Sequence, residues 1–153
     1  MAESPPSRPA AAARPHPGRR PTNRGPGLVL LSVYGLFALA AGARASVQIA
    51  TKFSEAPLAY LLSALAAVVY LIATIGMARS TTTSRRVAVA SCSFELAGVL
   101  IVGTASLIDR DAFPDATVWS TYGIGYGFVP LVLPILGLLW LRYSRPSASA
   151  EVA

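Results

Sequence analysis

The chain has 153 residues, of which 54% are hydrophobic and 13% charged, with a net charge of +6 and a mean hydropathy of +0.54. A soluble domain carries about a quarter charged residues, so this composition argues against a soluble fold and predicts an integral membrane protein. The basic residues lie mostly outside the apolar stretches and lack interleaved aromatic residues, which argues against a nucleic-acid partner and indicates attraction to lipid head groups.

Residues 1–26 are expected to form a disordered cytoplasmic tail. They hold seven prolines and five arginines but almost no large apolar side chains, so they cannot bury enough surface to offset the ordering entropy. The apolar stretch from Leu28 could belong to a secretory signal. The long, proline-rich segment before it and the apolar residues that continue to Ala50 favour an uncleaved first span instead.

Four apolar stretches predict an all-α fold with four transmembrane helices, because a hydrocarbon core of about 30 Å needs about 20 apolar residues in a helix. The spans lie at about 28–50, 57–78, 87–108 and 120–141. Continuous rather than alternating apolar runs argue against a β-barrel. Short connections predict an up-down-up-down bundle over residues 27–143, followed by a short cytoplasmic tail at 144–153.

The distribution of basic residues predicts that both termini are cytoplasmic. With that orientation, the inner segments 1–27, 79–86 and 142–153 carry ten Lys and Arg residues, while the outer segments 44–56 and 109–121 carry three. This asymmetry follows the positive-inside rule. The protein is therefore expected to be a multi-pass protein of the cell membrane.

Three polar residues follow one another at helical spacing where the first span ends: Arg44, Gln48 and Lys52. Long basic side chains can extend toward water at a membrane boundary. With Glu55 and the acids of residues 109–115, they predict an outer polar cluster. It would either anchor the helix at the interface or offer a surface to an external partner.

Small residues recur along one face of each of the first two spans. The first span has Gly35, Ala38, Gly42 and Ala45, and the second has Ser63, Ala67 and Thr74. Such stripes mark helix–helix contacts in membranes. Tyr34 and Tyr70 lie beside these stripes at similar depths.

Glu95 is the only formal charge well inside an apolar stretch, eight residues beyond Val87. That spacing places it about 12 Å from the inner boundary. A carboxyl at this depth is costly and is expected to face the bundle interior. We predict that Tyr70 donates a hydrogen bond to it, with Tyr34 nearby. The carboxyl would be either a packing lock or a coupling site for protons or cations.

The fourth stretch is interrupted by five residues, Gly123, Gly125, Gly127, Pro130 and Pro134. We expect the glycines to loosen its first turn and the prolines to kink the helix, and a broken helix can line a binding cavity. Gly125-Tyr126-Gly127 also matches the core of a potassium-channel filter, but the threonine position is lost, and a channel would need a tetramer.

Four aromatic residues are expected to mark the two interfaces of the fourth span: Trp119, Tyr122, Trp140 and Tyr143. The only cysteine, Cys92, is expected to be a small packing residue, and the only histidine, His16, lies in the tail. No catalytic or phosphate-binding motif appears. The sequence therefore predicts no enzyme, no metal site and no cofactor.

Four segments resemble an actinobacterial group of small integral membrane proteins to which no activity is assigned. They are ATKFSEAPLAY (50–60), FELAGVLIVG (94–103), FPDATVW (113–119) and GYGFVPLVLP (125–134). The resemblance covers residues 27–141. It implies four spans in an actinobacterial cell membrane and implies no catalytic residue.

Taken together, the residues predict a structural or accessory membrane component. Its small-residue faces could also serve a homo-oligomer or a membrane-protein partner. The alternative is a small carrier or proton-coupled transporter that uses Glu95, with Tyr70 and the break in the fourth helix.

Overall fold

The computed structural model describes residues 25–79 and 81–144. Nearly all of the expected N-terminal tail, and residues 145–153 of the C-terminal one, lie outside them. The described residues form four α-helices and one 3-10 helix, with no strand among them. The elements are α1 (Pro26–Lys52), α2 (Pro57–Ala78), α3 (Thr82–Ile108), η1 (Ser120–Tyr126) and α4 (Val129–Tyr143). The predicted all-α class is confirmed.

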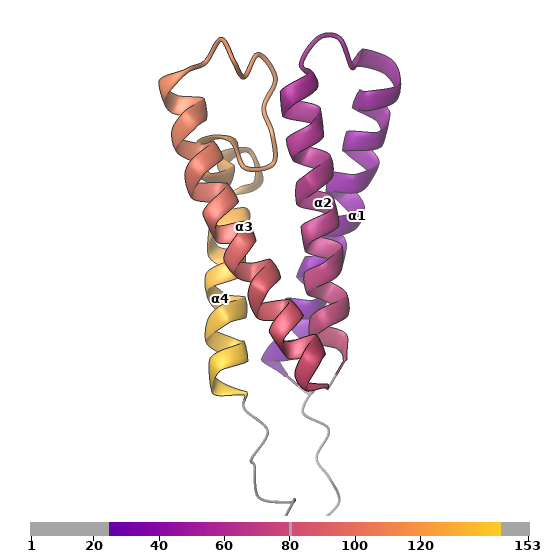
Figure 1. Ribbon diagram of the computed structural model, residues 1–153, viewed down its shortest axis with the longest axis vertical. Helices are drawn as coiled ribbons and strands as arrows, with labels where there is room; N and C mark the ends of the chain where they lie inside the picture. Colours follow the sequence, from indigo (N-terminus) through magenta and orange to yellow (C-terminus); the bar gives the residue numbers. More distant parts are fainter. Residues whose placement is uncertain (1–24, 80, 145–153) are drawn as a thin grey trace, which may run out of the picture.

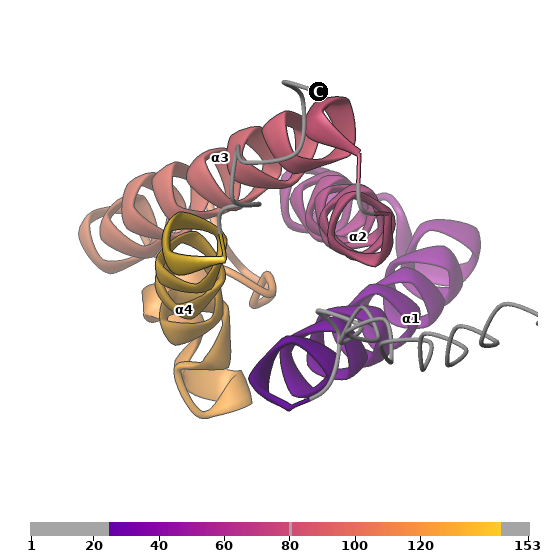
Figure 2. The same ribbon diagram turned by 90° about the horizontal axis from the view of Figure 1, so that it is seen from below.

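The four α-helices alternate in direction along the bundle (Figure 1). The start of α1, the α2–α3 turn and the end of α4 lie at one end, which we call the turn end (Figure 2). The connections at 53–56 and 109–119 lie at the opposite end, which we call the loop end. At the turn end, Arg85 donates a hydrogen bond to the carbonyl oxygen of Leu141, so α3 begins beside the end of α4.

Helix starts follow from local chemistry. α1, α2 and α4 each have a proline in the first turn, where the missing N–H has no helical partner to lose. α3 begins at Thr82, five residues before the predicted start at Val87, because the Thr81 hydroxyl accepts a 3.1 Å hydrogen bond from the Ser84 N–H.

Three helices, α1, α2 and α3, are long and apolar enough to cross a membrane. Large apolar side chains on these helices are exposed. Examples are Leu39 at 72%, Ile101 at 68% and Ile108 at 81% exposure. A soluble monomer rarely exposes contiguous apolar surface of this extent. The helices are therefore those of a multi-pass membrane protein.

The fourth segment differs from the single kinked helix predicted at 120–141. η1 and α4 are bent by 98° relative to each other, and they make a fourth span only if the bent pair is counted as one. The 15 residues of α4 rise about 22 Å, which is short of a hydrocarbon core of about 30 Å. Pro130 begins α4 instead of kinking it, and only Pro134 lies inside the helix.

Left-handed backbone conformations cause this bend. Thr121, Tyr122 and Gly123 have φ values of 50°, 59° and 78°, and Gly127 and Phe128 have 63° and 61°. Residues other than glycine adopt this region at a cost. The connection after α3 thus turns back from the loop end into the space between the helices (Figure 1), where Val118 and Trp119 are buried in the core.

Candidate functional site

Polar side chains from three helices and the folded-back segment meet in the interior of the bundle. We call this group the inner polar cluster: Tyr34 on α1, Tyr70 on α2, Cys92 and Glu95 on α3, and Trp119 just before η1. Trp119 is 2% exposed and the other four are 0% exposed. Tyr34 and Tyr70 contact each other, and Glu95 lies close to both of them, so the three residues that the sequence singled out for an intramembrane site lie together.

Close packing holds the cluster in place. The rings of Tyr34 and Tyr70 lie edge to face with centroids 6.1 Å apart, and the Tyr34 hydroxyl is 3.4 Å from the Cys92 sulfur. Gly137 on α4 makes room for this pair, because a Cβ atom there would lie 3.1 Å from the sulfur and 3.3 Å from the hydroxyl. Cys92 is buried as expected, and it also contacts a tyrosine.

Four atoms of the cluster have no hydrogen-bond partner among the described residues. They are both carboxyl oxygens of Glu95, the hydroxyl oxygen of Tyr70 and the indole nitrogen of Trp119. The predicted hydrogen bond from Tyr70 to Glu95 is therefore wrong, although both side chains lie in the cluster. An unpaired buried polar group costs about 1–3 kcal/mol, and more if it is charged, so these groups make the cluster polar without stabilising it.

Tyr70→Phe is expected to leave the melting temperature of the detergent-solubilised protein unchanged or slightly higher, because the Tyr70 hydroxyl has no bond to lose. The matched variant is Tyr60→Phe, since the buried Tyr60 donates a 2.6 Å hydrogen bond to Asp115. This second change is expected to lower the melting temperature. Equal losses in both variants would show that Tyr70 has a partner after all.

Trp119 is the member of the cluster that sequence analysis placed elsewhere. It was expected in an interfacial aromatic belt, but its ring packs against Gly98 on α3, where an added Cβ atom would lie 2.7 Å away. Its indole is buried because the connection after α3 folds back into the bundle. The signal in the sequence was the glycine at position 98, three residues after Glu95, which leaves space for a large ring on the same helix face.

The small-residue stripes of α1 and α2 face each other. A Cβ atom at Gly35 would lie 3.7 Å from the Thr74 methyl carbon, and one at Gly42 would lie 3.8 Å from the Ala67 Cβ atom. These are ordinary van der Waals distances, so the two helices already pack closely. The sequence marked each stripe as a helix–helix contact, and these residues lie where α1 and α2 contact each other.

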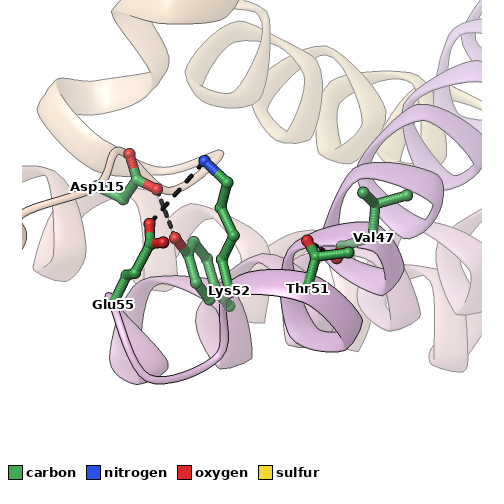
Figure 3. A network of polar contacts seen from close by, with 6 residues as sticks. Val47, Thr51, Lys52, Glu55 and Asp115 are labelled. Carbon is green, nitrogen blue, oxygen red and sulfur yellow. Dashed lines mark hydrogen bonds and ion pairs between the residues drawn. The ribbon is translucent and has the colours of Figure 1, made fainter.

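The outer polar residues do not form one ion-pair cluster. Arg44 donates a 2.5 Å hydrogen bond to the Tyr126 hydroxyl and lies 5.9 Å from the centre of that ring, so it ties α1 to η1. Lys52 pairs with Glu55 at 3.9 Å (Figure 3), and both side chains are exposed. The amide oxygen of Gln48 is buried without a partner.

Asp115 is the one acid of residues 109–115 that bonds to α2, through Tyr60 (Figure 3). An exposed pair such as Lys52 and Glu55 contributes about 0–1 kcal/mol to stability. The loop-end contacts therefore fix the connections more through Tyr60 and Tyr126 than through ion pairs.

The glycines of the fourth segment have different roles. Gly123 packs against Pro130, and a Cβ atom there would lie 2.7 Å from the proline ring, whereas nothing lies within 4 Å of one at Gly125 or Gly127. Gly123 and Gly127 have positive φ values, and Gly125 does not. The described part of the chain contains no group of three or more potential metal ligands.

Compared with protein-family models, curated proteins and solved structures, the chain matches none. Its class therefore follows from its own helices, which are those of a multi-pass membrane protein with three to four candidate spans. The inner polar cluster, which is buried and holds unpaired polar atoms, is the candidate functional site of this protein.

Proposed function

We propose that this protein is a structural or accessory component of the cell membrane, with four crossings if η1 and α4 are counted as one. The observation that carries the proposal is the enclosure of Glu95. Its side chain is 0% exposed, so neither water nor lipid reaches the carboxyl in this conformation. A carrier site needs access from one aqueous side at a time, and the packing around Glu95 provides none here.

The proposed orientation puts the turn end in the cytoplasm. Arg79, Arg85, Arg86 and Arg142 lie at that end, whereas the acids Glu55, Asp109, Asp111 and Asp115 belong to the connections at the loop end. Short basic segments are retained on the cytoplasmic side of a membrane. Both ends of the helical part would then face the cytoplasm.

A second candidate is a small proton-coupled carrier. It is favoured by the unpaired polar atoms of Glu95, Tyr70 and Trp119, because these atoms lower the stability of the fold and form no hydrogen bond that would explain their burial. The left-handed residues Thr121 and Tyr122 lie two and three residues after Trp119, and strained backbone of this kind is found where a segment changes conformation. A movement of this segment could give water access to Glu95.

Proton flux into vesicles separates the two functions. The wild-type protein, Glu95→Gln and Glu55→Gln are reconstituted with an internal pH-sensitive dye, and a potassium diffusion potential is applied. Glu55 is the control because it is an exposed acid paired with Lys52. The proposal predicts that none of the three proteins raises the flux above that of empty vesicles.

The opposite pattern would support the carrier. In that case the wild type and Glu55→Gln carry protons, and Glu95→Gln does not. Such a result would overturn the accessory role, since only a carboxyl that exchanges its proton with water can couple to flux.

A further inference from the structure

A groove lies between the end of α2 and the start of α3, at the turn end of the bundle. It has a volume of about 270 Å³ and is open on one side. Its lining residues are Ile72, Ile75, Gly76, Arg79, Thr83, Ser84 and Val87. The groove is separate from the inner polar cluster and shares no residue with it.

The lining of the groove changes from polar to apolar along α2. Arg79 follows the last residue of α2, and Ile72 lies seven residues earlier, about 10 Å deeper along the helix. Thr83 and Ser84 lie on the first turn of α3, level with Arg79, and Val87 lies one turn further in. A molecule that fills the groove therefore meets one cation and two hydroxyls at one end and apolar side chains at the other.

Charge at this end favours an anion. Arg79 and Arg86 are exposed, and Arg85 is turned toward Leu141. Of the acids in residues 25–79 and 81–144, four belong to the loop end and the fifth, Glu95, is enclosed. No acidic side chain of the described part competes for Arg79. Basic pockets between membrane helices on the cytoplasmic side bind anionic lipid head groups.

The floor of the groove depends on Gly76. A Cβ atom at this position would lie 3.0 Å from the Ala88 backbone nitrogen and 3.0 Å from the Ser84 carbonyl oxygen. The two helices therefore contact each other directly beside the groove. The apolar side chains of Ile72, Ile75 and Val87 that line it match an acyl chain in polarity.

We propose that this groove binds one anionic phospholipid of the cytoplasmic leaflet, with Arg79 at the headgroup phosphate and Ile72 and Ile75 beside an acyl chain. The proposal rests on the membrane orientation given above. The phosphate supplies a negatively charged partner for Arg79, which has none among the described residues, and Thr83 supplies a hydroxyl donor beside the phosphate. The chain enters the apolar part of the groove from the surrounding bilayer.

Native mass spectrometry of the full chain in detergent tests this proposal, with phosphatidylglycerol or phosphatidylcholine added. The wild type is expected to retain one phosphatidylglycerol in preference to phosphatidylcholine. One basic contact near the membrane surface is worth about 1 kcal/mol, so Arg79→Gln is expected to lower phosphatidylglycerol occupancy about fivefold. Thr83→Val is expected to lower it less.

The matched control is Arg86→Gln, which removes the same charge at the same end from a residue that does not line the groove. It is expected to leave occupancy nearly unchanged. Equal losses in Arg79→Gln and Arg86→Gln, or no preference for phosphatidylglycerol, would overturn the proposal. Displacement of the lipid by millimolar inorganic phosphate would overturn it as well, because the acyl chain would then contribute nothing. None of these results alters the vesicle flux, so failure here is distinct from failure of the proposed function.

Discussion

Trp119→Ala is expected to lower the free energy of unfolding by about 3–5 kcal/mol, as buried aromatic truncations do. Trp119 is the largest fully buried side chain in residues 25–79 and 81–144, and it joins the folded-back segment to α3. Without its ring, the segment that carries the left-handed residues loses its anchor in the core. Unfolding in mixed detergent micelles with increasing sodium dodecyl sulfate measures the change.

A double-mutant cycle with Gly98→Ala tests whether the loss comes from the Trp119–Gly98 contact. Gly98→Ala alone should be destabilising, since its Cβ atom would lie 2.7 Å from the indole ring. In the Trp119→Ala background the same change should be harmless, and coupling of about 0.5–3 kcal/mol is typical of residues in contact. Tyr143→Ala serves as the surface control, because Tyr143 is 82% exposed. Simple additivity of the two core changes would contradict the packing described here.

Glu95→Met is expected to raise the free energy of unfolding by about 1–3 kcal/mol, the penalty of leaving a buried polar group unpaired. Methionine has a similar length and no polar oxygen, and it adapts to irregular space. The gain is expected because both carboxyl oxygens lack partners. The same micelle titration measures it.

Glu95→Gln is the companion variant, since it keeps the shape and the polarity of the side chain. It is expected to stay well below Glu95→Met in stability, because its amide remains unpaired in the same enclosure. If Glu95→Met instead destabilised the protein, the carboxyl would be holding the bundle together, and the packing-lock interpretation of Glu95 would regain its support.

The first three helices could be predicted from the sequence because lipid makes length and apolarity decisive. The second span, predicted at 57–78, matches α2 at both ends. α1 and α3 extend a few residues past their predicted bounds, since hydrogen bonding and capping continue a helix into polar residues such as Thr82 and Lys52. Which helix faces contact each other was also readable, from the spacing of Gly35 and Gly42.

The fourth segment could not be predicted in the same way. Its composition suits a continuous span, but the bend depends on the φ angles of residues such as Thr121 and Phe128, which do not favour that region by themselves. The tertiary packing of Trp119 overrides the local preference. The predicted hydrogen bond from Tyr70 to Glu95 was wrong for a related reason, since equal depth in a membrane does not fix the direction in which a hydroxyl points.

The most direct test of the account is cysteine accessibility in intact cells, because the account depends on a membrane between the turn end and the loop end. Thr83 and Ala112 are exposed residues at the turn end and in the connection at the loop end, respectively. Each is changed to cysteine in a Cys92→Ala background. A membrane-impermeant maleimide is expected to label Ala112→Cys in intact cells and Thr83→Cys only after permeabilisation. Labelling of Thr83→Cys in intact cells would contradict the proposed orientation, and equal labelling of both positions would contradict the membrane crossings themselves.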